Sequence, residues 1–544
     1  MPVENLQSNI DGAFGLIQQN QMTEASVLCK KLSDTMGPNP LVSFLFAAID
    51  LKNGELVSAI EHLKTAIRLD PAVTEYHLTL ANTQKSLGNY EDAIEHYEYA
   101  LKLSPSNVDI LNNYGLALKE KKRYPDAIKT FQNALDEDPN LVPTRLNLAK
   151  LLRELGQKQN AIDCLNGFDS EVAATFAVTK ASYQLPVIPE SIQDMKQSRA
   201  DYEREVMALS DIHCEINEEL LLYVGTNFFA AYQGVDDKIF QEIIASFYLR
   251  NCFSLNYVAP NLGAGPVERI KIGFISSNFY NHTVGKLFRG LIANLNRELF
   301  DVTVFSSGPT SDEIGNFIKN NSDHNVTLVR DLNSARETIG KRELNILFYA
   351  DIGMDAFTYF LAFSRLAPVQ CVGWGHGVTT GIPTIDYFIS NIDMEETDAY
   401  RAESHYTEKL IRLSLPPFYL YPVQKYDPRE MPDLFFAESR TLYCCPQSLF
   451  KIHPEFDPLL IEILRQDESG VAVFIETWPG WSDILMTRWR RIDEKAAQRI
   501  HFLPKLDQNS FLALLKHADV ILDSIFFCGG ITSVEALAFG KPIV

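Results

Sequence analysis

The chain has 544 residues, of which 46% are hydrophobic and 22% charged, and this balance predicts a soluble globular protein with more than one domain. Its formal net charge of −21 argues against nucleic acid or anionic membranes as partners. The eight cysteines include no CxxC pair, the N-terminus lacks a signal-peptide pattern, and no apolar run reaches membrane-spanning length. We therefore expect a cytoplasmic protein without a disulfide framework or a zinc site.

The first third of the chain repeats with the 34-residue period of tetratricopeptide repeats. The small alanine of a recurring Ala-Ile pair lets two helices approach closely. A glycine, replaced in one copy by Lys122, stands at the turn between them, and a proline ends the second helix. The pairs are Ala59-Ile60, Ala93-Ile94, Ala127-Ile128 and Ala161-Ile162, and the prolines are Pro71, Pro105 and Pro139. With a degenerate leading repeat in residues 1–40, this pattern predicts an α-solenoid over residues 1–171.

Asn113 and Asn147 occupy equivalent positions in the first helix of successive repeats. Their amides could line a concave groove and bind the backbone of a protein or peptide acceptor. The equally weighted alternative is that they only solvate a helix face. A second copy of the chain, bound through the repeats as a homodimer, is another candidate partner.

After residue 171 the repeats stop, and Pro186 and Pro189 interrupt the chain. The amphipathic stretches that follow predict an all-helical connector over residues 172–265. We expect this connector to cover the end of the solenoid.

From Arg269 onward, strand and helix patterns alternate, which predicts doubly wound α/β structure. A stretch rich in Pro and Tyr, Leu415–Pro432, divides this part into halves at residues 266–425 and 426–544. Two Rossmann-like halves with a cleft between them fit the GT-B arrangement of glycosyltransferases, although fold alone does not give function.

The chain is organised around a strand–loop–helix stretch in the second half. The apolar run Val520–Leu522 predicts a buried parallel strand, and a Gly-Gly turn ending at Gly530 leads into a helix. Thr532, Ser533 and the helix N-terminus suit a phosphate or pyrophosphate, and Glu535 in the first turn suits a ribose hydroxyl pair. The alternative is an ordinary strand–loop–helix unit with a capping Thr or Ser.

Five sequence words occur in order behind the repeats, and their combination resembles the catalytic region of the O-GlcNAc transferase/SPINDLY family, its bacterial members above all. The resemblance covers residues 266–544 and implies metal-independent transfer from a nucleotide sugar, with no further cofactor. The words are Ile275–His282, Leu366–Gln370, Thr379–Tyr387, Leu449–Ile452 and Gly529–Leu537.

Lys451 lies in the loop after the strand at residues 442–445. Its ammonium could stabilise the departing diphosphate, where negative charge develops during glycosyl transfer. Its neighbours Gln447 and Ser448 could reach the phosphates. Because no Asp-x-Asp follows a strand in the catalytic half, we expect Lys451, Thr532, Ser533 and the helix dipole to replace a metal.

His282 follows the first strand of the first half, and the family places a functional histidine there. A neutral imidazole could accept a hydroxyl proton, or orient the acceptor or the donor phosphate. Lys286, one turn further on, could face the cleft or be solvated. His376, between two glycines, could touch the sugar through its backbone or ring. Phe511 could stack on the nucleobase, although a core phenylalanine is the commoner reading.

These features predict an inverting, metal-independent protein O-glycosyltransferase that transfers GlcNAc from UDP-GlcNAc to Ser or Thr of proteins bound by the repeats. One alternative within the family is a different donor, such as GDP-fucose in a protein O-fucosyltransferase. Another, from a different class, is a repeat scaffold with an inactive transferase region. Since the chain stops at the apolar stretch Pro542–Val544, we also expect it to be a fragment whose second half is incomplete.

Overall fold

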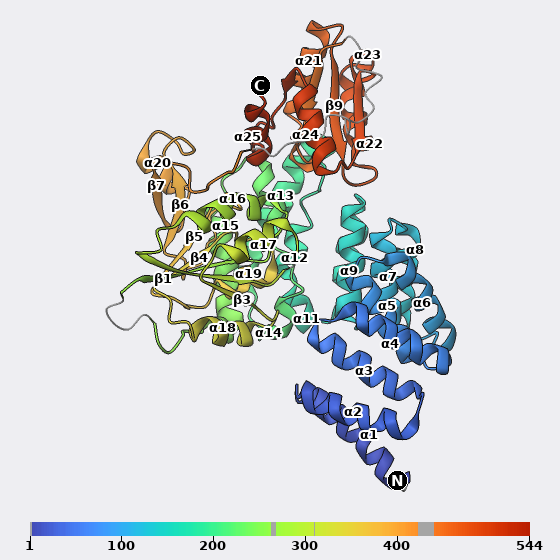
Figure 1. The fold of residues 1–544 in the computed structure, drawn as a ribbon. Helices are drawn as coiled ribbons and strands as arrows, with labels where there is room; N and C mark the ends of the chain where they lie inside the picture. The colour runs from blue at the N-terminus through green and yellow to red at the C-terminus, as the bar shows by residue number, and fades with distance from the viewer. Residues whose placement is uncertain (1–2, 263–267, 309, 423–439) are drawn as a thin grey trace. The chain divides into compact units, whose positions relative to one another are not determined.

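The computed structural model describes residues 3–262, 268–308, 310–422 and 440–544 (Figure 1). Contacts between Cα atoms divide the chain into two units, Met1–Leu152 and Arg153–Val544, and each is described by itself. The boundary expected between the two α/β halves, at residues 425 and 426, lies outside the described residues.

The first unit is built from helices packed in pairs. The alanines of its Ala-Ile pairs, Ala59, Ala93 and Ala127, are fully buried, which lets paired helices approach closely. Gly54 and Gly88 have φ of 81° and 79°, and Lys122 takes the same left-handed turn at 60°. The helices are α1 (Val3–Gln18), α2 (Met22–Met36), α3 (Pro40–Asn53), α4 (Leu56–Leu69), α5 (Thr74–Ser86), α6 (Tyr90–Leu103), α7 (Val108–Glu120), α8 (Tyr124–Glu137) and α9 (Val142–Glu154).

The second unit begins with the last repeat helix and the connector. Lys158 of the repeat helix α10 donates hydrogen bonds to the Gln184 carbonyl and to Ser198 Oγ, so this helix is bound to the connector. The elements are α10 (Lys158–Asn166), α11 (Ser170–Thr175), α12 (Ala177–Ser182), α13 (Ile192–Ala208), η1 (Leu209–Asp211), α14 (Glu218–Leu221), η2 (Phe228–Gln233), α15 (Lys238–Asn251) and η3 (Phe253–Asn256).

A seven-stranded parallel sheet follows, in the order β3-β2-β1-β4-β5-β6-β7. The chain moves outward from β1 in one direction and then returns to continue from β4 in the other, so the loops after β1 and β4 diverge at a switch point where ligands bind. The elements are β1 (Ile270–Ser276), α16 (Thr283–Asn294), β2 (Phe300–Ser306), α17 (Glu313–Asn320), β3 (His324–Thr327), α18 (Leu332–Gly340), β4 (Ile346–Tyr349), α19 (Ala356–Leu361), β5 (Val369–Val372), β6 (Tyr387–Asn391), α20 (Ala399–Ser404) and β7 (Lys409–Leu413).

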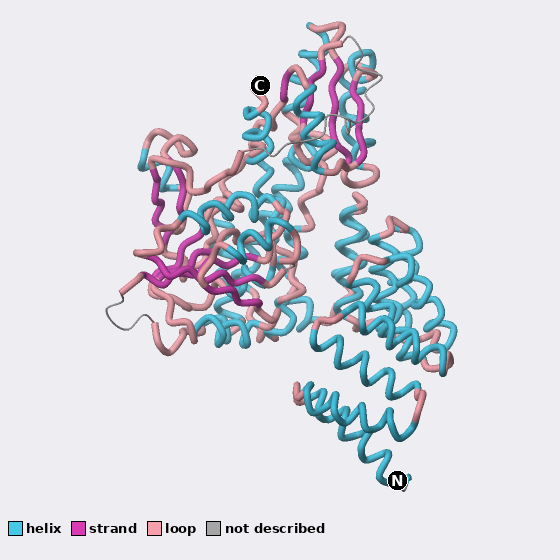
Figure 2. The backbone as a smooth tube through the Cα atoms, in the orientation of Figure 1, coloured by secondary structure: helices cyan, strands magenta, loops and turns pink. Residues whose placement is uncertain are grey.

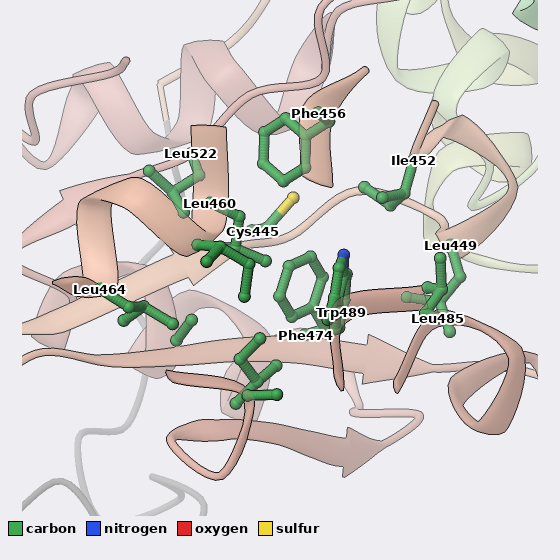
Figure 3. Packing of buried hydrophobic residues seen from close by; sticks show 14 of the residues in the cluster. Cys445, Leu449, Ile452, Phe456, Leu460, Leu464, Phe474, Leu485, Trp489 and Leu522 are labelled. Carbon is green, nitrogen blue, oxygen red and sulfur yellow. The ribbon is translucent and has the colours of Figure 1, made fainter. Parts of the chain in front are cut away.

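A second parallel sheet has the order β10-β9-β8-β11, and Figure 2 shows the two sheets as separate groups of strands. One face packs on a core around Trp489 and Phe474, whose ring centroids lie 5.0 Å apart (Figure 3). The elements are β8 (Leu442–Cys445), η6 (Leu449–Lys451), α21 (Phe456–Gln466), β9 (Val471–Glu476), α22 (Trp481–Ile492), α23 (Glu494–Ala497), β10 (Ile500–Pro504), α24 (Gln508–His517), β11 (Val520–Ile521) and α25 (Ile531–Ala538). The predicted order of helical repeats followed by parallel α/β structure is confirmed.

Candidate active site

Lys451 stands at the end of η6, in the loop that follows β8. Its Nζ donates hydrogen bonds to Gln447 Oε1 at 3.1 Å and to the Cys528 carbonyl at 3.2 Å. The same Nζ lies 5.0 Å from the centroid of the Phe527 ring. Burial lowers the pKa of Lys451, while the charge of Asp523 acts in the opposite direction. The ammonium is therefore held at a fixed place between the loops after β8 and β11.

The same hydrogen-bond chain reaches the start of α25. Buried Gln447 donates from Nε2 to Thr532 Oγ1 at 3.0 Å, and Thr532 donates to the Gly529 carbonyl at 2.8 Å. The N-cap residue of α25 is Gly530, which has no side chain that could cap the helix. Lys451, Gln447 and Thr532 thus gather beside a helix end whose N–H groups suit an anion.

Asp523 organises this loop, a role that the sequence analysis missed. Its Oδ2 accepts hydrogen bonds from the Gly529 N–H at 3.2 Å and from Ser533 Oγ at 2.9 Å. The available signal was its place directly after the Val520–Leu522 strand pattern, where a short acidic side chain can accept from a following loop. The Ser533 hydroxyl therefore donates its hydrogen to Asp523 and holds the loop, and the Ser533 oxygen can still accept a hydrogen bond.

The two glycines of the loop meet different requirements. A Cβ atom on Gly529 would lie 2.1 Å from Gln447 Nε2, 2.3 Å from Ser533 Oγ and 2.5 Å from Thr532 Oγ1. Gly530 has open space around it but a φ of 53°, so glycine is favoured there because it adopts this backbone conformation readily. Only glycine at 529 lets these three polar groups surround the backbone.

His282 caps the N-terminus of α16. Its Nδ1 accepts from the Val284 N–H at 3.3 Å, so the neutral ring carries its proton on Nε2. Burial, and then the nearby charge of Lys286, lowers the pKa of His282. Among the alternatives drawn from the sequence, this geometry favours a neutral ring that donates from Nε2 over one that accepts a proton there.

A buried aspartate holds the loop before His282. Asp351, after β4, accepts from Asn278 Nδ2 at 3.0 Å and from the Ser276 hydroxyl. Burial raises the pKa of Asp351 to about 6. The loops after β1 and β4 are therefore joined at the switch point of the sheet.

A cavity of about 330 Å³ lies between α16 and the helices α24 and α25. Lys286 faces it: its Nζ donates to Gln508 Oε1 at 2.9 Å and lies 3.7 Å from Glu535 Oε1. Burial raises the pKa of Glu535, and Lys286 and Gln508 counteract that rise. Of the two readings of Lys286, the structure supports the one that faces the cleft. The other lining residues include Asn281, Arg289, Glu313, Tyr421, Asn509 and Ile531.

His376 belongs to an aromatic cluster. It is buried, its ring stacks on Phe228 with centroids 5.4 Å apart, and burial lowers its pKa to about 4. The rings of Phe228 and Tyr232 in η2 both contact the ring of Phe450. The ring centroids of Tyr232 and Phe527 lie 4.7 Å apart. The connector thus joins the surroundings of His376 to those of Lys451. The sequence did not predict this contribution because Phe228 and Tyr232 lie in no motif.

Four predicted site residues remain, and one of them contacts Lys451: the Ser448 carbonyl accepts a hydrogen bond from the Lys451 N–H at 2.9 Å. Ser448 precedes η6 without a capping hydrogen bond, and Phe511 is partly buried against the core of the second sheet. In the first unit, Asn113 Oδ1 accepts from Lys85 at 2.7 Å, and Asn147 donates to Asn112 Oδ1 at 3.0 Å. Asn112, which also accepts from Thr144, was missed because it does not recur with the repeat period.

Comparison with known proteins gives the class. Residues 252–420 match the model of glycosyl transferase family 41, and residues 78–141 and 118–171 match tetratricopeptide repeat models. Part of the chain is therefore similar to family 41 glycosyltransferases and follows a part that is similar to tetratricopeptide repeats, and the predicted resemblance to the O-GlcNAc transferase/SPINDLY proteins is confirmed.

Among curated proteins, the chain is 23% identical over 316 residues to the probable UDP-N-acetylglucosamine–peptide N-acetylglucosaminyltransferase SEC of Arabidopsis thaliana, covering 56% of this chain and 32% of that protein. It is 24% identical over 327 residues to the corresponding SPINDLY protein of Solanum lycopersicum, covering 57% and 34%. A UDP-glucose:protein N-beta-glucosyltransferase of Actinobacillus pleuropneumoniae is 38% identical over 68 residues, covering 12% and 10%. The chain thus spans about a third of the length of the plant relatives.

Among solved structures, an O-GlcNAc transferase mutant of Thermobaculum terrenum has a TM-score of 0.61 and 23% sequence identity, covering 87% of this chain and 82% of that chain. This likeness shows a shared fold. Within the described ranges, no helix combines the length and apolar character needed to cross a bilayer.

Proposed function

We propose that the chain carries the catalytic region of a protein O-glycosyltransferase that moves GlcNAc from UDP-GlcNAc to Ser or Thr hydroxyls. The observation that carries the proposal is the hydrogen-bonded group of Lys451, Gln447 and Thr532 beside the uncapped end of α25. A diphosphate gains negative charge as its bond to the sugar breaks, and an ammonium, a hydroxyl and a helix N-terminus stabilise that charge. The names of the plant relatives support UDP-GlcNAc as the donor and a peptide as the acceptor.

In the proposed inverting reaction, the acceptor hydroxyl oxygen attacks the anomeric carbon from the side opposite the diphosphate. The bond from that carbon to the diphosphate oxygen breaks, and the hydroxyl proton leaves with the diphosphate. Lys451 binds the leaving diphosphate, and the Thr532 hydroxyl turns to it from the Gly529 carbonyl. Ser533 keeps the loop in place through Asp523. His282 donates from Nε2 and orients the acceptor or a phosphate oxygen, since its Nδ1 is engaged by Val284. Glu535 accepts from the ribose hydroxyls in the cavity beside α16.

A donor screen tests the proposal. The full-length protein is titrated with UDP-GlcNAc, UDP-glucose and GDP-fucose, and transfer to a Ser/Thr-containing protein acceptor is followed by mass spectrometry. We expect binding and transfer with UDP-GlcNAc. Transfer of fucose alone would support the fucosyltransferase alternative. Transfer of glucose to a protein nitrogen would support the activity named for the Actinobacillus relative. Binding without transfer of any sugar would favour the inactive scaffold.

Transfer is expected to survive chelation. The groups assigned to the diphosphate belong to the protein, and in the described residues no three His, Cys, Asp or Glu side chains gather as a candidate metal site. Initial rates are measured in excess EDTA, with EDTA pre-saturated by Mg²⁺ as the control. Loss of transfer that Mg²⁺ or Mn²⁺ restores would show that the metal-independent mechanism is wrong.

Replacing Asn113 and Asn147 with Ala is expected to slow glycosylation of protein acceptors while hydrolysis of the free sugar nucleotide stays nearly unchanged. Each lost hydrogen bond contributes roughly 0.5–1.5 kcal/mol net, so the double variant should lose about fivefold to a hundredfold in acceptor kcat/KM. The matched control is Asn140→Ala, at an exposed position in a turn of the same unit. If protein glycosylation is unchanged, the repeats do not read the acceptor, and binding of a second copy becomes the better account.

A further inference from the structure

One ion pair joins the two α/β halves across the cavity. Lys286 of α16 lies 3.7 Å from Glu535 of α25 and donates to Gln508 of α24, 222 residues along the chain. The side chains of Lys286 and Glu535 are only 23% and 14% exposed. Water therefore screens this pair less than it screens a pair on the open surface.

The charge of this ion pair affects how a negatively charged ligand would bind beside it. If Glu535 binds the ribose, as the proposed function holds, a carboxylate stands in a partly buried cavity whose lining reaches the start of α25 at Ile531, next to the residues assigned to the diphosphate. An unpaired carboxylate there would repel that ligand, and burial would also favour its protonated form. Lys286 is the cation that meets Glu535 directly.

We propose that Lys286 is a positioning residue for the nucleotide sugar: it neutralises Glu535 and holds its carboxylate toward the cavity, so that the diphosphate enters without repulsion. This inference rests on the proposed function and adds a residue to it. Lys286 acts through Glu535, whereas Lys451 meets the leaving group.

The inference predicts a change in pH dependence. The groups that face Glu535 are Lys286 and the neutral amide of Gln508, and the charged residues that line the same cavity are Arg289 and Glu313. His282 lies one turn before Lys286, and the charge of Lys286 adds to the effect of burial in lowering the pKa of His282. Lys286 opposes the rise that burial causes in the pKa of Glu535. Without Lys286 this carboxyl should bind a proton at higher pH, and its repulsion should fade as the solution becomes more acidic.

The test measures the dissociation constant of UDP, and in parallel of GDP, by titration calorimetry on the full-length protein. At about pH 8.5, Lys286→Met should bind the nucleotide about tenfold to a hundredfold more weakly than the wild type. At about pH 5.5 the ratio of the variant's dissociation constant to that of the wild type should become markedly smaller. Protonation of the nucleotide itself does not affect this ratio, because both proteins bind the same nucleotide at the same pH. Adding Glu535→Gln to Lys286→Met should recover most of the lost affinity at the higher pH.

Matched variants separate this role from a loss of structure. Lys319→Met removes an exposed lysine of α17 with the same charge change and should bind like the wild type. Lys286→Arg keeps the charge and should bind within a few-fold of wild type. Thermal melting checks the fold of each variant, and Lys286→Gln, which can still bond Gln508, replaces Lys286→Met if the latter does not fold.

Two results would overturn the inference. One is wild-type affinity in Lys286→Met at both pH values. The other is an affinity loss that is independent of pH and is not recovered by Glu535→Gln, which would mean that Lys286 touches the nucleotide itself. A wild-type protein that binds neither UDP nor GDP is a different outcome, because it rejects the proposed function and the inference with it.

Discussion

Lys451→Ala is expected to reduce kcat for glycosyl transfer about a hundredfold to a thousandfold, the usual cost of removing one group that stabilises charge in a transition state. The ammonium is fixed by Gln447 and the Cys528 carbonyl, so it needs no rearrangement as the diphosphate leaves. The free energy of unfolding should change little. The cost of burying the ammonium offsets much of the stabilisation that its two hydrogen bonds give. The measurement is single-turnover transfer together with the melting temperature.

The matched control for this variant is Lys505→Ala, which removes an exposed lysine after β10 in the same α/β half. It should transfer at the wild-type rate. Near-wild-type kcat and KM in Lys451→Ala would reject the assignment of Lys451 to the diphosphate. An unchanged kcat with a raised KM would mean that Lys451 binds the ground state and the transition state equally.

Gly529→Ala should produce the other large effect, a loss of about a hundredfold or more in kcat/KM for the donor. The added Cβ would come 2.1 Å from Gln447 Nε2 and 2.3 Å from Ser533 Oγ. It must therefore push apart the groups that we assign to the diphosphate. Steady-state kinetics with varied donor, and calorimetry with UDP, measure the loss.

Gly340→Ala is the control for this substitution, because a Cβ there meets only Ala259 Cβ at 3.4 Å, an ordinary contact distance. It should leave donor kinetics unchanged. If Gly529→Ala keeps donor affinity and rate, the loop between β11 and α25 does not hold the diphosphate. Loss of fold in Gly529→Ala is checked by melting, and a milder result is then sought with Gly530→Ala, whose cost is conformational because its φ is 53°.

The helix pairs and turns of the repeats were predictable from the sequence, because the same residue types recur at the same positions in each repeat. Alanine, glycine and proline recur in one register, so the helix pairs and even the left-handed turn at Lys122 follow from local rules. Strands followed by polar loops likewise place Lys451 and Thr532 at one edge of a sheet, since the carboxyl ends of parallel strands share that edge. These inferences need no knowledge of which distant segments meet.

Pairings between distant segments were not predictable in the same way. Whether Lys286 is solvated or paired depends on Gln508 and Glu535, which come from helices in the other α/β half. The ring of His376 is buried against Phe228, a connector residue that lies in no motif. Phe511 illustrates the same limit, because only its contacts with the core of the second sheet favour packing over stacking on a base.

The aromatic residues of η2 have a practical consequence for the design of shorter versions of the protein. Phe228 and Tyr232 contact Phe450, and Gly234 approaches Phe526 so closely that a Cβ would lie 2.7 Å from its ring. A truncation that begins at the first strand of the α/β region would strip these side chains away and leave their partners facing water. Limited proteolysis should accordingly release a stable piece whose N-terminus lies before residue 228, and expression trials aimed at a smaller catalytic unit should choose their starting points upstream of that position.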